Sequence, residues 1–189
     1  MDKAVFLDRD GTLNQDSGYI AKPEDFHLYP FVIEALTKLK KLNYKLFVVT
    51  NQSGVARGYY TGKDVDKIHG KLKQLLAKND IYLDDIFYAP YHKDGIKAPY
   101  NVEHPDRKPG LGLFKKCLQK YDIKIKASFM IGDKYSDIAF GKKAHLQTIQ
   151  VLTGEGWNSF LHQRKTWKYH PDYVVKNLLT ASKLIEKLS

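Results

Sequence analysis

The stretch Ala4-Val5-Phe6-Leu7-Asp8-Arg9-Asp10-Gly11-Thr12 decides the fold class of this 189-residue chain. Its first four residues form a short, continuously apolar run, which is typical of a buried parallel strand. Residues two apart in an extended chain face the same way, so we expect Asp8 and Asp10 to start on one side. Gly11 then allows a turn, because it has no side chain to obstruct the backbone. The stretch therefore predicts a strand that delivers two acidic side chains to its carboxyl end.

Two carboxylates crowded at the end of a strand repel each other unless a cation or a proton lies between them. Carboxylate oxygens are ligands that Mg²⁺ takes in proteins, and a positioned acid can also move protons during a reaction. An Asp-rich turn without chemistry is the alternative for an isolated motif of this type. Asp8 and Asp10 therefore indicate metal and acid–base chemistry if other polar segments converge on them.

Apolar runs recur along the chain with helical patterns between them. The predicted strands are 5–7, 46–49, 86–89, 129–131, 148–151 and 173–175, and the predicted helices are 32–42, 65–76, 113–121 and 178–188. Alternating strands and helices predict a mainly parallel sheet that is covered on both faces. We therefore expect one Rossmann-like three-layer α/β/α domain over residues 1–189. The segments between the motifs are too short for a folded lid, so no separate cap domain is expected.

Composition narrows the classes of partner. A net charge of +10 favours anionic partners. These are either small phosphorylated molecules or nucleic acid, but lysine is spread along the chain, so general solubility is favoured over nucleic-acid binding as the reason for the charge. No window approaches the ~20 apolar residues of a membrane span, and no signal segment begins the chain, so no membrane partner is expected. Cys117 is the only cysteine, which favours a reducing cytoplasm. No sequence feature indicates a dimer, so a monomer is expected.

Three further polar segments end a strand or begin a helix, where this architecture binds ligands. Residues 50–54, Thr-Asn-Gln-Ser-Gly, offer hydroxyl, amide and N–H groups suited to phosphate oxygens. Residues 107–110, Arg-Lys-Pro-Gly, place two cations before a helix N-terminus, which favours anions. Residues 132–137, Gly-Asp-Lys-Tyr-Ser-Asp, supply two more carboxylates. Each segment alone is explained as a turn or a helix cap, but their combination with the first motif indicates a phosphate-handling site.

In this order, the four motifs resemble those of the haloacid dehalogenase superfamily of phosphotransferases. The strings FLDRDGTLN (6–14), GYI (18–20), VTNQSGVARG (49–58), RKPG (107–110) and GDK (132–134) are similar to one subfamily. It contains D-glycero-D-manno-heptose 1,7-bisphosphate 7-phosphatases and histidinol-phosphate phosphatases. The resemblance covers nearly the whole chain and implies a Mg²⁺-dependent hydrolase that removes the 7-phosphate of the heptose bisphosphate. The alternatives are histidinol phosphate or a nucleic-acid 3′-phosphate as substrate, and a non-enzymatic phosphate-binding interaction module.

The resemblance implies roles for four catalytic residues. Asp8 would attack phosphorus and form an aspartyl-phosphate, which splits hydrolysis into two steps. Asp10 would protonate the leaving alkoxide and then activate the water that cleaves the intermediate. Thr50 and Lys108 would hold the oxygens of the transferring phosphoryl group.

The resemblance also implies a metal site and a substrate site. Mg²⁺ would be held by Asp8, the backbone carbonyl of Asp10, and Asp133. Asp137 is expected to support Lys108 or the water around the metal rather than to bind the metal itself. The substrate-binding residues implied by the resemblance are Asp16, Ser17, Gly18, Tyr19, Asn51, Gln52, Ser53, Arg107 and Lys134.

The segment between the second and third motifs departs from the resembling subfamily. Many members carry a zinc-holding loop there, with three Cys and one His. The corresponding positions in this chain are Ala89, Tyr91, His104 and Asp106. No cysteine remains among them, so structural zinc is not expected. Packing of tyrosine side chains is predicted to order the loop instead.

Residues 157–170, WNSFLHQRKTWKYH, interleave aromatic side chains with cations. We expect an extended loop whose aromatic side chains pack on the edge of the sheet while the cations stay in water. The alternative is a platform on which nucleic-acid bases stack.

Overall fold

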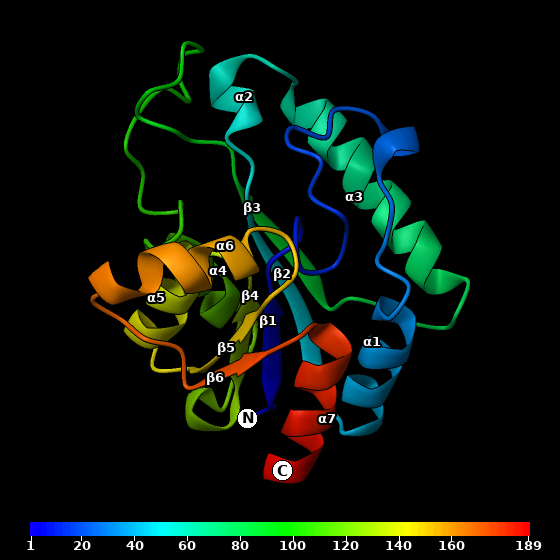
Figure 1. Ribbon diagram of the computed structural model, residues 1–189. Helices are drawn as coiled ribbons and strands as arrows, with labels where there is room; N and C mark the ends of the chain where they lie inside the picture. Colours follow the sequence, from blue (N-terminus) through cyan, green and yellow to red (C-terminus); the bar gives the residue numbers. More distant parts are fainter.

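The computed structural model describes residues 1–189 and contains a six-stranded sheet between two layers of helices (Figure 1). The strands are β1 (Ala4–Leu7), β2 (Lys45–Asn51), β3 (Asp85–Ala89), β4 (Phe129–Gly132), β5 (Gln147–Val151) and β6 (Tyr173–Val175). The helices are α1 (Val32–Lys41), α2 (Gly54–Arg57), α3 (Gly62–Ala77), α4 (Gly112–Lys120), α5 (Tyr135–Lys143), α6 (Gly156–Asn158) and α7 (Leu178–Leu188). The predicted three-layer α/β class, without a separate cap domain, is confirmed.

The sheet is parallel throughout and has the order β3-β2-β1-β4-β5-β6. The chain builds from β1 outward to β3 and then returns to the other side of β1 to form β4. Ligands in such sheets bind where the strand order reverses, here between β1 and β4. Leu7 pairs with Val48 on one side and Ile131 on the other. The carboxyl ends of β1, β2 and β4 therefore meet at one edge.

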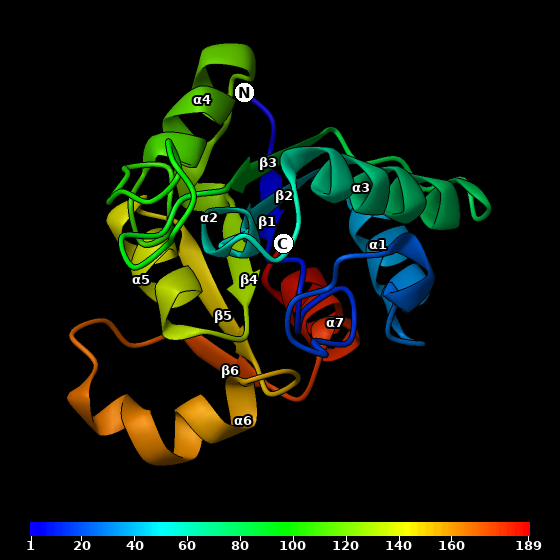
Figure 2. The same ribbon diagram turned by 90° about the horizontal axis from the view of Figure 1, so that it is seen from above.

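Strand β1 is buried on both faces, which explains its continuously apolar sequence. Val5 and Leu7 belong to a core of 23 buried residues, whereas Ala4 and Phe6 belong to a second core of 14. Helices α1, α3 and α7 cover the first face, and α4 and α5 cover the second (Figure 2).

Helix α3 begins with a capping box in which Thr61 and Asp64 satisfy each other's backbone N–H groups. Ile68, Leu72 and Leu76 face the larger core at helical spacing. The next residue after Ile68, His69, lies on a neighbouring face of the same helix and is also buried.

Helix α5 was not predicted from the sequence. Its buried residues follow one another from Asp137 to Gly141, so the segment shows no amphipathic spacing. A helix that is buried on most sides gives no periodic signal.

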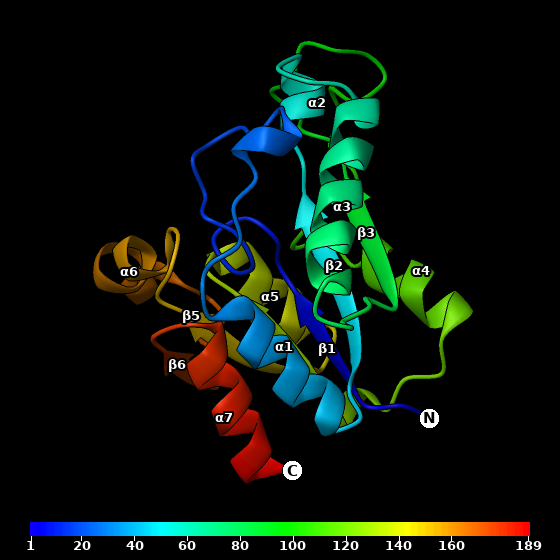
Figure 3. The same ribbon diagram turned by 90° about the vertical axis from the view of Figure 1, so that its right-hand side faces the viewer.

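The expected extended loop over residues 157–170 is wrong in part. Residues 156–166 form a series of short helical turns, which project beside β5 (Figure 3). Trp167 packs on Tyr135, with 5.0 Å between ring centroids, whereas Trp157 is 56% exposed. Of the two tryptophans, Trp167 alone is packed on the protein, and its partner ring belongs to α5 rather than to the edge of the sheet. None of the helices in the fold combines the length and apolar character needed to cross a membrane.

Candidate active site

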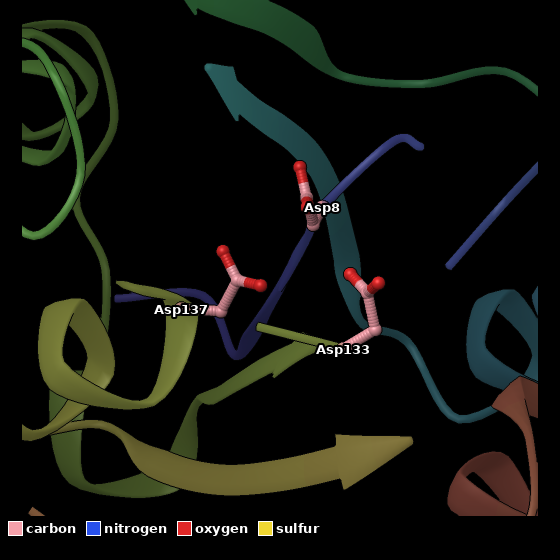
Figure 4. Close-up of side chains that lie close together, drawn as sticks. All are labelled: Asp8, Asp133 and Asp137. Carbon is pink, nitrogen blue, oxygen red and sulfur yellow. The ribbon is translucent and has the colours of Figure 1, made fainter. Parts of the chain in front are cut away.

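Three carboxylates gather where the strand order reverses (Figure 4). Asp8 follows β1, Asp133 follows β4, and Asp137 lies in the first turn of α5; one oxygen of each lies within 4.8 Å of the others. The pKa of Asp8 is raised to about 6, mainly by burial and secondly by repulsion from Asp137. The pKa of Asp133 is also raised, mainly by burial and secondly by repulsion from Asp8. A cation between these side chains would relieve the repulsion.

Asp133 is held with one oxygen unpaired. Its Oδ2 accepts a hydrogen bond from the N–H of Glu155 at 2.8 Å, while its Oδ1 is buried without a hydrogen-bond partner. Gly11 and Gly154 both have positive φ angles, and a Cβ on either would overlap the Asp133 carboxylate. A buried, unpaired carboxylate oxygen next to a second carboxylate fits a hard cation such as Mg²⁺.

Lys108 is the counter-charge to two of these acids. Its buried Nζ lies 3.0 Å from Asp8 Oδ1 and 2.6 Å from Asp137 Oδ1, and it donates to the carbonyl of Val49 at 2.6 Å. Burial lowers the pKa of Lys108, but the negative charges of Asp137 and Asp8 have the larger, opposite effect, so the pKa is raised overall. The expected support of Lys108 by Asp137 is present as an ion pair.

The side chain of Asn51 forms two hydrogen bonds with the backbone of Lys108. Its Nδ2 donates to the Lys108 carbonyl at 3.1 Å, and its Oδ1 accepts from the Lys108 N–H at 2.9 Å. Both ends of the Asn51 amide are therefore bonded to the protein rather than free for a ligand.

The carboxylate of Asp10 accepts hydrogen bonds from four donors. Arg9 donates from Nε at 3.0 Å and Nη2 at 2.8 Å, and the amides of Asn14 and Gln52 each donate at 2.9 Å. Burial raises the pKa of Asp10, but the charge and hydrogen bonds of Arg9 outweigh it, so the pKa is lowered. Arg9 is fully buried, and the sequence analysis missed its role. The available signal was a cation placed between two acids at the end of a buried strand.

Thr50 presents its hydroxyl group to a small cavity. The Thr50 Oγ1 accepts from Gln52 Nε2 at 3.0 Å, and no protein group accepts the Thr50 hydroxyl proton. The cavity has a volume of about 160 Å³ and is lined by Asp8, Asp10, Thr50, Asn51, Ser53, Arg107, Lys108, Lys134 and Ser136. Ser136 is a lining residue that the sequence analysis did not single out.

The loop over residues 16–19 lies at the rim of this site. Asp16 pairs with Lys134 at 3.0 Å and accepts a hydrogen bond from the N–H of Gly18, whose φ is +98°. Ser17 is exposed, and the exposed ring of Tyr19 packs on Tyr59 with 4.5 Å between centroids.

Arg107 is a cation without an acidic partner. Its Nη1 donates to the carbonyl of Tyr91 at 3.3 Å, and no carboxylate forms an ion pair with it. The pKa of Arg107 is lowered, mainly by burial and secondly by repulsion from Arg57. An anion near the rim would complete its environment.

The loop that departs from the resembling subfamily is ordered by contacts between side chains. The ring of Tyr91 stacks on His104 with 3.7 Å between centroids, and Tyr100 packs against Tyr91 at 5.8 Å. Asp106 is buried and pairs with Lys116 of α4. Ala89 is the last residue of β3 and is buried. The four positions that resemble zinc positions are thus occupied by a stacked pair, an ion pair and a core alanine.

This arrangement predicts that the loop keeps its structure without zinc. A zinc-selective chelator is expected to leave the rate of phosphate release in excess Mg²⁺ unchanged. Loss of activity on chelation would contradict the prediction.

Tyr91→Ala is expected to raise KM several-fold, because the ring of Tyr91 belongs to the same residue as the carbonyl that accepts a hydrogen bond from Arg107. Steady-state kinetics with Tyr82→Ala, an exposed tyrosine elsewhere, provide the control.

The sequence of this chain is similar to a hydrolase family model and, over its full length, to known phosphatases. The family model described as "HAD-hyrolase-like" matches residues 106–181, the segment from Asp106 through β6 into α7. A D-glycero-beta-D-manno-heptose-1,7-bisphosphate 7-phosphatase of Haemophilus influenzae is 36% identical over 100% of this chain and 99% of its own length. A D-glycero-alpha-D-manno-heptose-1,7-bisphosphate 7-phosphatase of Photorhabdus laumondii is 35% identical over 97% of each chain.

A solved structure has the same architecture. The D,D-heptose 1,7-bisphosphate phosphatase of B. bronchiseptica, complexed with magnesium and phosphate, superimposes with a TM-score of 0.85 and 25% identity over 99% of each chain. The chain therefore belongs to the haloacid dehalogenase superfamily, in the family of the heptose-bisphosphate phosphatases.

Proposed function

We propose that this protein hydrolyses the 7-phosphate of D-glycero-D-manno-heptose 1,7-bisphosphate in the presence of Mg²⁺. The observation that carries the proposal is full-length similarity to phosphatases named for this substrate, in a chain whose cavity combines Asp8, Asp10, Thr50 and Lys108. The cytoplasm is the proposed compartment, since the single cysteine, Cys117, is free and the chain contains no second cysteine for a disulfide.

Asp8 is the proposed nucleophile. Its Oδ1 accepts from the N–H of Arg9 at 2.8 Å and faces Lys108, whereas its Oδ2 accepts no hydrogen bond from the protein. This oxygen forms the bond to phosphorus while the bond from phosphorus to the leaving alkoxide breaks. The Thr50 hydroxyl and the Lys108 ammonium group hold phosphoryl oxygens as their charge redistributes.

Asp10 is the proposed proton carrier. In the first step it acts in its protonated form, which its lowered pKa makes the minor form, and gives that proton to the leaving alkoxide. In the second step it takes a proton from the water that attacks the aspartyl-phosphate. The products are the alcohol and inorganic phosphate, and both aspartates return to their starting states.

Asp8 and Asp133, with the backbone carbonyl of Asp10, would hold the metal ion. When bound, Mg²⁺ supplies the positive charge that lets an anionic carboxylate approach an anionic phosphate. The unpaired Oδ1 of Asp133 supports this assignment.

Arg107 is proposed to recognise the second anionic group of the substrate. It lines the cavity together with Lys134, and it has no acidic partner. A planar guanidinium group can pair with two phosphate oxygens at once. The loop over residues 16–19 and the segment Asn51–Ser53 complete the proposed substrate-binding set. The half-buried amide of Asn51 and the buried amide of Gln52 would act there through Lys108 and Asp10.

A matched substrate panel tests the proposal. Phosphate release would be measured with both anomers of heptose 1,7-bisphosphate, histidinol phosphate and a 3′-phosphorylated oligonucleotide. We expect kcat/KM for one heptose anomer to exceed the other substrates by about a hundredfold or more, which is about 2.7 kcal/mol of transition-state discrimination. Preference for histidinol phosphate or the oligonucleotide would overturn the substrate assignment, and equal slow turnover would place the substrate outside the panel.

Mg²⁺ is expected to be required for turnover and to stabilise the fold. Excess EDTA should abolish phosphate release, and added Mg²⁺ should restore it. At a hundred times its Kd, Mg²⁺ is expected to add about 2.7 kcal/mol to the unfolding free energy, or about 5–10 °C in Tm. Asp133→Asn should lose this thermal shift, whereas Asp122→Asn, a surface variant, should keep it. Full activity in EDTA would contradict the metal assignment.

A further inference from the structure

We propose that His69 and Tyr60 are positioning residues for Asp10. His69 fixes the guanidinium group of Arg9, Tyr60 fixes the amide of Gln52, and these two groups hold the Asp10 carboxylate. The inference rests on the proposed function, in which Asp10 moves protons.

The first contact chain runs through Arg9. Two of its nitrogens, Nε and Nη2, are bonded to Asp10, and Nη1 lies 3.2 Å from His69 Nε2. Arg9 and His69 are both buried, so no water competes for these groups. Burial, followed by the charge of Arg9, lowers the pKa of His69 to about 3, so the imidazole is neutral and accepts at Nε2. The guanidinium group is thereby held on the Asp10 carboxylate at one end and on the imidazole at the other.

The second contact chain runs through Gln52. Tyr60 Oη donates to Gln52 Oε1 at 2.8 Å, which leaves Gln52 Nε2 to donate to Asp10 and to Thr50. An amide has a donor end and an acceptor end, and a flip would turn its oxygen toward the Asp10 carboxylate. The Tyr60 hydroxyl group opposes that flip. Space for the Tyr60 ring depends on Gly54, because a Cβ there would overlap the ring.

Both positioning residues come from outside the cavity. Tyr60 and His69 belong to the segment from the end of α2 into α3, and neither lines the cavity around Asp8. They are therefore expected to affect the placement of the proton carrier rather than the binding of substrate. A sugar alkoxide needs a proton to leave, whereas nitrophenolate does not, so the effect should depend on the leaving group.

Four variants test the inference with the full-length enzyme in Mg²⁺. Tyr60→Phe removes the donor to Gln52, and His69→Leu removes the acceptor for Arg9. His69→Gln restores an acceptor oxygen. Tyr88→Phe is the control, because the Tyr88 ring contacts His69 at 5.5 Å between centroids but its hydroxyl group bonds to neither chain. Asp10→Asn provides the reference for complete loss of proton transfer.

The expected result is a split between substrates and between kinetic constants. Tyr60→Phe and His69→Leu should lower kcat on a sugar phosphate about tenfold, with KM unchanged and less than about threefold loss on nitrophenyl phosphate. His69→Gln should recover most of the rate, and Tyr88→Phe should match wild type. If His69→Leu fails to fold, Tyr60→Phe and His69→Gln still carry the test.

Two results separate failure of the inference from failure of the proposed mechanism. If Asp10→Asn discriminates between the substrates but Tyr60→Phe retains wild-type kcat, or loses equally on both, the positioning roles are wrong. If Asp10→Asn itself loses equally on both substrates, Asp10 is not the proton carrier, and the inference falls with that assignment.

Discussion

Asp8→Asn is expected to lower kcat by about 10⁴-fold or more on every phosphate ester, because an amide is a poor nucleophile. The fold should survive the change. Lys108 keeps its ion pair with Asp137 and its hydrogen bond to the Val49 carbonyl. Removing one of three crowded acids also reduces their repulsion, so the unfolding free energy in EDTA should equal or exceed that of wild type. Phosphate release and urea denaturation measure the two effects.

A surface substitution separates loss of the nucleophile from a general change in charge. Asp122→Asn removes an exposed carboxylate that pairs only with the chain's amino terminus, and it should leave the rate unchanged. Mass spectrometry of acid-quenched wild-type enzyme should detect a phosphorylated peptide containing Asp8, which the Asn variant lacks. Substantial turnover by Asp8→Asn would show that the covalent route is wrong.

Lys108→Met is expected to lower the unfolding free energy in EDTA by about 3–5 kcal/mol, and to abolish turnover. Lys108 is buried together with Asp8 and Asp137, so its loss leaves two carboxylates without a counter-charge in a medium of low dielectric. The Val49 carbonyl also loses a donor. Urea denaturation gives the change in stability.

A second substitution identifies the cause of that loss. Lys108→Met combined with Asp137→Asn removes one of the unpaired charges, so it should recover part of the stability without recovering activity. Lys120→Met breaks an exposed ion pair with Asp85 and should change little. If Lys108→Met is as stable as wild type, the buried ion pairs contribute nothing to the fold.

The placement of the site was predictable from the sequence because it depends on a general property of parallel sheets. Asp8 and Thr50 belong to neighbouring strand segments, Asp133 follows the strand on the other side, and such strand ends meet at one edge. Lys108 comes from a loop, and the structure brings it to the same cavity. The six strand positions required only apolar runs and their separations, whereas the order of the strands came from the structure.

The orientation of individual side chains was not predictable in the same way. Gln52 was expected to face substrate, but its amide is buried between Asp10, Thr50 and Tyr60. His69 lies within a helix that already shows a core pattern, so nothing in the local sequence pointed to its contact with Arg9. Such contacts depend on how distant segments pack, and a single sequence carries no periodic signal for them.

The reacting groups and the recognition groups come from different parts of this fold. Asp8, Thr50 and Asp133 are fixed by the central strands, whereas the loop over residues 16–19 and Arg107 lie on surface segments at the rim. Substitutions in these rim segments can therefore accumulate during evolution without disturbing the sheet. Descendants of one ancestral chain would then inherit the same hydrolytic step and diverge in the molecule they dephosphorylate. Exchanging these rim loops between relatives should transfer substrate preference while the rate on a generic ester stays the same.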